Sequence, residues 1–216
     1  MRKLLRTNLY FIIPQLIFLV AGLVMLYFMG SEATHIYFNE INSPFLDQFF
    51  KYLTHLGDGL VFVPMLLFFL MISYRKTIAF ALGIIISNIF VQSGKHLFFP
   101  EALRPSKYFE EVSSYELHLV EGVDLHSYHS FPSGHTATAF LVLAMLAMLS
   151  RNNWVKVLCF ALAVFVSFSR VYLSQHFLED IIVGSVIGTL SMFFAWLWME
   201  KSNKQWLDSG IARKNV

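Results

Sequence analysis

Long apolar runs dominate the chain, and short polar or charged segments separate them. Six such runs lie at about 9–30, 59–74, 77–94, 135–150, 153–173 and 180–199. Most approach the length that an α-helix needs to cross the hydrocarbon of a bilayer, where a helix satisfies its own backbone hydrogen bonds. The pattern therefore predicts an all-α polytopic membrane protein with six transmembrane helices.

Two of the intervening segments are long, at 31–58 and 96–131. In the first, apolar residues recur at intervals of three and four: Phe45, Leu46, Phe49, Phe50, Leu53 and Leu56. This spacing predicts a short helix over about 43–57 with one apolar face. Such a helix can lie in the membrane interface with that face toward lipid, or it can pack over the spans as a cap. The sequence leaves both arrangements open.

Composition agrees with a membrane protein, because 56% of the 216 residues are hydrophobic and only 14% are charged. A soluble domain carries about 25% charged residues. The net charge of +2 is small and spread over short loops, which argues against nucleic-acid binding. The single Cys159 excludes an intramolecular disulfide and a paired-cysteine metal site. The length suits one domain over 1–216, with its core at about 59–199.

Lysine and arginine are distributed unevenly between the two ends of the predicted spans. One end has eleven: Arg2, Lys3, Arg6, Arg75, Lys76, Arg151, Lys156, Lys201, Lys204, Arg213 and Lys214. The other end has five: Lys51, Lys95, Arg104, Lys107 and Arg170. Because cytoplasmic loops carry the excess of basic residues, both termini are predicted in the cytoplasm. The helix at 43–57 is then extracytoplasmic.

Candidate chemistry collects at the predicted outer end. Lys95 closes the third span, and Arg104-Pro105 follows it; the residues Pro132 to His135 open the fourth span. Ser169 and Arg170 end the fifth, while His176 and Asp180 precede or open the sixth. Ionisable groups at span ends are costly unless they serve a site, so their convergence at one membrane face predicts a functional site.

These residue types fit phosphate chemistry. Lys95, Arg104 and Arg170 supply cations, and arginine can grip phosphate oxygens through two parallel hydrogen bonds. Ser133 and Gly134 lie where the fourth span begins, and the free N–H groups of a first helical turn favour an anion. A site this cationic can neutralise a phosphoryl transition state without a metal ion. We therefore expect no metal and no cofactor.

A histidine nucleophile fits the same site. His176 and Asp180 are four residues apart, and they share a helical face if the sixth helix begins before His176. The carboxylate would then hold one ring nitrogen and leave the other free to attack phosphorus. His135 is the natural general acid for the leaving group, and afterwards the base for the attacking water.

The order and spacing of these residues resemble the signature of the type 2 phosphatidic acid phosphatase superfamily. That signature is K-x6-RP, then PSGH, then SR-x5-H-x3-D. The second part is intact at Pro132 to His135, and the third is intact in Ser169, Arg170, His176 and Asp180. The first part departs, because eight residues separate Lys95 from Arg104. Six spans with the motifs on outer loops resemble the integral membrane branch of the superfamily.

The resemblance implies roles that agree with those inferred from the residues. It implies His176 as nucleophile, Asp180 as its orienting partner and His135 as acid and base. It also implies a set of phosphate-binding residues: Lys95, Arg104, Ser133, Gly134 and Arg170.

The expected function is metal-independent hydrolysis of a lipid phosphate or diphosphate through a phosphohistidine. In similar bacterial enzymes the substrates include undecaprenyl diphosphate, phosphatidylglycerophosphate, phosphatidic acid and lipid A phosphates. We expect a bacterial inner-membrane protein whose site faces the periplasm or exterior, with no nucleic acid and no obligate protein partner. Two alternatives are phosphotransfer to a lipid or sugar hydroxyl, and a non-catalytic lipid transporter or scaffold.

Overall fold

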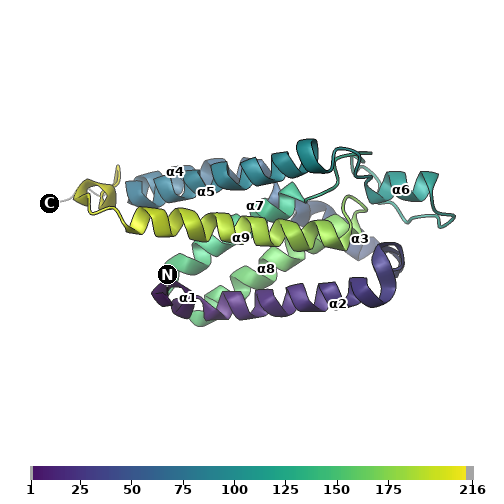
Figure 1. Cartoon of the computed structure of the whole chain (residues 1–216), viewed down its shortest axis with the longest axis horizontal. Helices are drawn as coiled ribbons and strands as arrows, with labels where there is room; N and C mark the ends of the chain where they lie inside the picture. The colour runs from purple at the N-terminus through teal and green to yellow at the C-terminus, as the bar shows by residue number, and fades with distance from the viewer. Residues whose placement is uncertain (1, 213–216) are drawn as a thin grey trace.

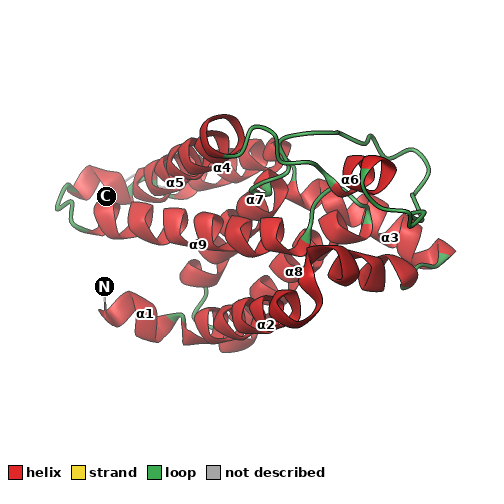
Figure 2. Cartoon of the chain, turned by 45° about the vertical axis from the view of Figure 1, so that its right-hand side comes forward, coloured by secondary structure: helices red, strands yellow, loops and turns green. Residues whose placement is uncertain are grey.

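The apolar runs are helical in the computed structural model, which describes residues 2–212. Within that part of the chain the regular structure is entirely helical, without a strand (Figure 2). The longer helices run along one another, and the N-terminal helix and the C-terminal segment lie toward the same end (Figure 1). The elements are α1 (Arg2–Thr7), α2 (Leu9–Glu40), α3 (Pro44–Leu53), η1 (Thr54–Gly57), η2 (Gly59–Val61), α4 (Phe62–Ile72), α5 (Tyr74–Ser93), η3 (Gly94–Phe98), α6 (Pro105–Glu111), α7 (Gly134–Leu149), α8 (Asn153–Tyr172), α9 (Leu178–Glu200) and η4 (Gln205–Asp208). The predicted all-α class is confirmed.

Length and hydropathy make several of these helices membrane spans. Among the described residues, four helical segments are long and apolar enough to cross a bilayer: Leu9–Glu40, Tyr74–Phe98, Asn153–Tyr172 and Leu178–Glu200. A fifth is possible if α3-η1 and η2-α4, which meet at a 52° bend, count as one broken span. Helix α7 is apolar but has only 16 residues. The chain is therefore a polytopic membrane protein, while the count of six stays a prediction.

The first span extends past its predicted end at Gly30. Helix α2 continues to Glu40, but Gly30 adopts φ 76° and ψ 173°, which interrupts the helix with a kink. Glycine adopts a positive φ without the steric cost that a Cβ imposes. Beyond the kink, Thr34, His35 and Asn39 are buried. The hydrophobic pattern missed this extension because its inward face is polar.

The turn between the second and third spans lies two residues earlier than expected. The predicted runs 59–74 and 77–94 leave Arg75 and Lys76 between them, whereas the helices break at Ser73 and α5 already includes both basic residues. The C-terminal segment explains the shift. Ser73 Oγ donates to the Leu207 carbonyl at 3.1 Å, and the Tyr74 amide donates to the Ser209 carbonyl at 2.8 Å.

The predicted helix at 43–57 is present as α3 followed by η1. Its apolar residues divide between two environments. The predicted packing over the spans is confirmed for one side of the helix, while its placement in a membrane interface stays a prediction. Phe50 is buried against Tyr172 at the end of α8, with Leu46 and Leu53 partly buried beside it. Phe45 is 75% exposed, and Phe49 and Leu56 are also exposed. The helix thus caps α8 with one side and presents aromatic surface with another.

Helix α7 forms the centre of the bundle and packs closely against α9. Gly184 and Gly188 of α9 form a small-xxx-small pair, which lets two helix backbones approach each other. A Cβ on Gly184 would lie 2.6 Å from the Ser133 carbonyl oxygen, and one on Gly188 would overlap the Ala137 carbonyl. This contact brings the start of α7 beside the start of α9, where the Ser133 amide donates to the Asp180 carbonyl at 3.1 Å.

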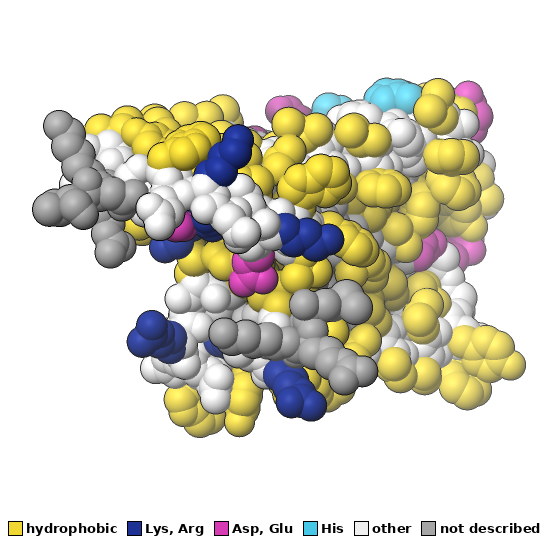
Figure 3. All heavy atoms as spheres, turned by 60° about the vertical axis from the view of Figure 1, so that its left-hand side comes forward, with side chains coloured by type: hydrophobic (Ala, Val, Ile, Leu, Met, Phe, Trp, Pro, Cys, Tyr) yellow, Lys and Arg dark blue, Asp and Glu magenta, His cyan; other side chains and the backbone are white. Residues whose placement is uncertain are grey.

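Basic side chains gather at the end of the molecule where the termini lie, and hydrophobic side chains cover much of the adjoining surface (Figure 3). Arg213 and Lys214, which entered the charge count, lie outside the described residues. The shared location of the two termini agrees with an even number of crossings. The orientation of the bundle in a membrane stays a prediction.

Candidate active site

Four parts of the chain meet at the end of the bundle opposite the termini. His135 lies in the first turn of α7, Arg170 near the end of α8, and His176 in the loop before α9. Lys95 and Arg104 come from η3 and from the residue before α6. The positive charges of Lys95, Arg104 and Arg170 all act on His176. The structure thus brings the predicted charged residues together.

His176 and Asp180 form a buried pair. His176 Nδ1 lies 3.0 Å from Asp180 Oδ2, and the two residues are 1% and 2% exposed. The condition for a shared helical face is not met, because α9 begins at Leu178 and His176 precedes it. Asp180 nevertheless reaches back as the third residue of the helix, where the same Oδ2 also accepts the Phe177 amide at 3.0 Å. The carboxylate therefore caps the helix and holds the imidazole.

The contact with Asp180 determines which ring nitrogen of His176 carries the proton. An ionised carboxylate only accepts hydrogen bonds, so Nδ1 carries the proton in the neutral ring and Nε2 carries the lone pair. Among the described residues, none bonds to Nε2. Burial lowers the pKa of His176 well below its usual value, and the charges of Arg104, Arg170 and Lys95 lower it further. Burial and the neighbouring cations therefore both favour the neutral imidazole of His176.

The two arginines are buried and share a partner. Arg104 is 7% exposed, and its Nε donates to the Tyr128 carbonyl at 3.1 Å. Arg170 is 6% exposed, and its Nη1 donates to Thr54 Oγ1 at 2.8 Å. Both guanidinium groups donate to Oε1 of Gln175, at 3.2 and 3.0 Å respectively. Burial lowers the pKa of Arg104, yet a guanidinium remains protonated at physiological pH.

A π-helical turn accommodates the longer spacing in the first motif. Residues Gly94–Phe98 continue α5 as a π-helix, in which the Phe99 amide donates to the Gly94 carbonyl at 2.9 Å. Such turns are frequent at functional sites. His129 Nδ1 donates to the Lys95 carbonyl at 3.0 Å and so ties this turn to the loop before α7. Lys95 is partly buried and within electrostatic range of Arg104, Arg170 and Asp180.

The start of α7 has free donors beside these cations. Ser133 is the N-cap, and its Oγ accepts the Thr136 amide at 3.4 Å. Gly134 is the first helical residue, so its amide is not used within the helix. His135 follows and lies within electrostatic range of His176 and Arg170. The eight predicted site residues therefore occupy one region.

Comparison with known proteins agrees with this geometry. The model of the PAP2 superfamily matches residues 76–204, which is more than half of the chain. The chain belongs to the PAP2 superfamily. This confirms the family that the three motifs predicted, and with the phosphatases among its relatives it confirms the predicted phosphatase class.

Individual PAP2 relatives cover most of the chain. A lipid A 4'-phosphatase from Bacteroides thetaiotaomicron is 27% identical over 184 residues, which cover 81% of this chain and 78% of the relative. Phosphatidylglycerophosphatase B from Bacillus subtilis is 29% identical over 172 residues, covering 74% and 79%. The crystal structure of Aquifex aeolicus LpxE aligns with a TM-score of 0.66 and 27% identity, covering 76% of this chain and 93% of that chain.

Sequence reasoning missed three residues that contact the PAP2 motif residues. Thr54 and Gln175 hold the arginines, and Ser130 donates to Asp180 Oδ2 at 2.5 Å. Ser130 lies two residues before the second motif and Gln175 directly precedes His176, so proximity in sequence was the available signal. Thr54 lies more than a hundred residues from Arg170, and no local pattern marks it. Within residues 2–212, no group of three or more metal-ligating side chains comes together.

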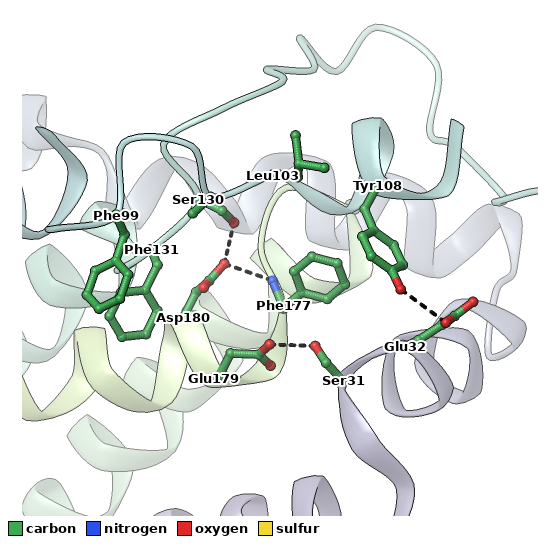
Figure 4. Close-up of a pocket in the computed structure, with 11 residues that line it drawn as sticks. Ser31, Glu32, Phe99, Leu103, Tyr108, Ser130, Phe131, Phe177, Glu179 and Asp180 are labelled. Atoms are coloured by element: carbon green, nitrogen blue, oxygen red, sulfur yellow. Dashed lines mark hydrogen bonds between the residues drawn. The ribbon is translucent and has the colours of Figure 1, made fainter. Parts of the chain in front are cut away.

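A cavity of about 480 Å³ borders the His176–Asp180 pair on the side of Asp180. Figure 4 shows it between α2 after the kink, the loop around α6 and the start of α9. Its wall is mainly apolar and includes carboxylates from α2 and α9: Ser31, Glu32, Phe99, Ala102, Leu103, Tyr108, Ser130, Phe131, Phe177, Glu179 and Asp180. Tyr108 donates to Glu32 at 3.2 Å, and Ser31 donates to Glu179 at 2.5 Å. An apolar space therefore adjoins the charged site.

Proposed function

We propose that this PAP2 enzyme hydrolyses a lipid phosphate through a phosphohistidine at His176. The observation that carries the proposal is the buried His176–Asp180 contact at 3.0 Å, which leaves Nε2 unbonded beside three cations. A neutral ring nitrogen with a free lone pair is a nucleophile, and the cations stabilise charge on the transferred phosphoryl group.

In the first step, the Nε2 lone pair of His176 attacks phosphorus and the bond from phosphorus to the lipid oxygen breaks. His135 donates a proton to that oxygen, so the lipid leaves as an alcohol or a shorter phosphate. Lys95, Arg104 and Arg170 bind the nonbridging oxygens, together with the Gly134 amide at the start of α7, beside the N-cap Ser133. Asp180 stabilises the positive charge that develops on His176.

In the second step, water attacks the phosphohistidine and the bond from nitrogen to phosphorus breaks. His135, deprotonated by the first step, accepts the proton of the water, and inorganic phosphate leaves. His176 then regains its neutral state. The balance of both steps requires no oxidant, reductant or metal ion.

The substrate class follows from the setting of the site. The bundle spans a membrane, and the apolar cavity beside Asp180 suits the lipid part of a substrate whose phosphate reaches His176. The relatives act on lipid A and phosphatidylglycerophosphate by their names, so these two substrates come first. Phosphatidic acid and undecaprenyl diphosphate are the remaining candidates. The site faces the periplasm or exterior if both termini are cytoplasmic.

The test is phosphate release by the purified protein in detergent with EDTA, across these four lipids. We expect His176→Ala to reduce release by at least about 10⁴-fold, because the covalent step is lost. His126→Ala is the matched control, since His126 is an exposed loop residue. Full activity in His176→Ala would rule out the nucleophile.

Trapping the intermediate provides a second test. In His135→Ala the second step lacks its base, so phosphorylated protein should accumulate with a radiolabelled substrate. The label should be acid-labile and stable to base, as for phosphohistidine. Transfer of label to an added lipid or sugar hydroxyl, with no free phosphate, would identify phosphotransfer instead.

Orientation requires a separate measurement. In a Cys159→Ala background, a cysteine at Ser127 should react with an impermeant thiol reagent added to intact cells. A cysteine at the exposed Asn203, beside the C-terminus, should react only after lysis. The reverse pattern would place the site in the cytoplasm.

A further inference from the structure

Gln175 joins the two buried arginines of the site. Its side chain is 3% exposed, and Oε1 accepts from Arg104 Nη1 at 3.2 Å and from Arg170 Nη2 at 3.0 Å. Its backbone carbonyl accepts from the same Arg104 nitrogen at 3.2 Å, and its amide donates to the Arg170 carbonyl at 2.9 Å. Gln175 thus accepts three hydrogen bonds from the two guanidinium groups, and a fourth hydrogen bond joins its amide to the backbone of Arg170.

A further hydrogen bond fixes the orientation of the Gln175 side-chain amide. Gln175 Nε2 donates to the Asp124 carbonyl at 2.5 Å, which directs Oε1 toward the arginines. An amide flipped the other way would place N–H donors against two guanidinium groups that can only donate. Each contact of the side chain therefore depends on the presence of an acceptor at Oε1.

The amide oxygen holds the arginines without neutralising them. Two guanidinium groups repel each other, and a carboxylate is the usual buried partner. Among the described residues, neither Arg104 nor Arg170 forms a salt bridge. Arg170 Nε is buried without an acceptor, and Arg104 Nη2 has no partner among the described residues. Both charges and several donors remain for an anion.

We propose that Gln175 is a positioning residue that fixes the spacing of Arg104 and Arg170 for a phosphate group while leaving their combined charge intact. The role rests on the proposed phosphatase function. It predicts that an acceptor and neutrality are both required at this position, and two substitutions separate these requirements. Gln175→Met keeps the length and neutrality but removes the acceptor. Gln175→Glu keeps an acceptor at Oε1 but adds a negative charge and replaces the Nε2 donor to the Asp124 carbonyl with an oxygen.

Steady-state kinetics and anion binding measure the two requirements. We expect Gln175→Met to lower kcat about 100-fold, because the arginines lose their fixed positions. We expect Gln175→Glu to raise KM, and to weaken the binding of inorganic phosphate about tenfold or more, because the added charge opposes the anion. Isothermal titration calorimetry with inorganic phosphate reports binding independently of lipid turnover. Gln48→Met and Gln48→Glu, at an exposed position of α3, are the matched controls.

The pH dependence of kcat/KM distinguishes a positioning role from a purely structural one, because a purely structural residue would not change it. The charged or titratable groups around His176 are Asp180, Lys95, Arg104, Arg170 and His135. An added carboxylate near this set favours the imidazolium, so Gln175→Glu should move the acid limb of kcat/KM upward by about one pH unit. Gln175→Met should leave that limb in place, since it adds no charge.

The outcomes distinguish this inference from the proposed function. Unchanged phosphate affinity and pH profile in Gln175→Glu, with normal melting temperature, would overturn the positioning role. Equal losses of melting temperature and active fraction in both variants, with KM unchanged, would show a structural role only. Absence of phosphate binding by the parent would also overturn it. Anion binding that depends on Gln175, without turnover of a lipid, would contradict the proposed function and retain the positioning role.

Discussion

Arg75 and Arg170 lie at opposite ends of the bundle, and their hydrogen-bond partners differ. Arg75 donates from all three nitrogens: to the Asp208 carboxylate at 2.7 and 3.1 Å, and to carbonyls of Met199, Ser202 and Lys204. Arg170 donates to neutral oxygens, and its Nε lacks an acceptor. An arginine whose donors are all used ties helices together, whereas one with unmet donors and no carboxylate can bind an anion.

The largest expected effect is on activity at the site end. Arg170→Ala should lower kcat/KM by about 10³-fold, since it removes a charged donor that faces the transition state. Arg170→Lys should recover part of this loss, because lysine keeps the charge without the planar fork. Phosphate release measures both, with the exposed Arg151→Ala as control. A loss below tenfold in Arg170→Ala would contradict the contrast between the two arginines.

The next effect is on stability at the terminal end. Arg75→Ala should reduce the free energy of unfolding by about 2 kcal/mol, because carbonyls at the end of α9 lose a charged donor. The ion pair with Asp208 contributes little to this free energy of unfolding, since the Asp208 side chain is 60% exposed and solvent screens the pair. Thermal or denaturant unfolding in detergent measures this change, with Lys76→Ala as control. kcat/KM of the folded variant should stay within twofold of the parent.

The smallest expected effect is the pH dependence that the unpaired cations cause. The pKa of His176 is lowered by burial and by Arg104, Arg170 and Lys95, so the neutral nucleophile persists as pH falls below 6.5. An unperturbed histidine would be only about one-tenth neutral at pH 5.5. We expect most of kcat/KM to remain there, since this parameter reports the free enzyme. A tenfold loss between pH 6.5 and 5.5 would show that the cations do not act on His176.

The contrast also shows what the sequence could predict. The apolar runs predicted most of the helices, because a long apolar segment must leave water and, in a membrane, does so as a helix. Fixed spacing predicted His135, His176 and Asp180, and the structure places them together. The same spacing could not predict how His176 meets Asp180, since the helix starts two residues later than the expected face required.

Contacts between segments that are distant in the chain could not be predicted from the sequence. Thr54 is one of several polar residues in an amphipathic helical segment, so its sequence context does not mark it. Its hydrogen bond with Arg170 forms because η1 packs on α7 and α8. The extension of α2 past Gly30 has the same cause, since its polar inner face follows no apolar period. The turn at Ser73 depends on the C-terminal segment, more than a hundred residues away.

The double use of the Asp180 carboxylate links folding to chemistry. Its Oδ2 accepts from the first amide before α9 and from the imidazole of His176. Any event that withdraws this oxygen from the ring changes the cap of the helix, and fraying of the first turn of α9 removes the partner of the ring. The His176 imidazole and the start of α9 are therefore thermodynamically coupled. Hydrogen exchange at the Phe177 amide should report the state of the proposed nucleophile during turnover.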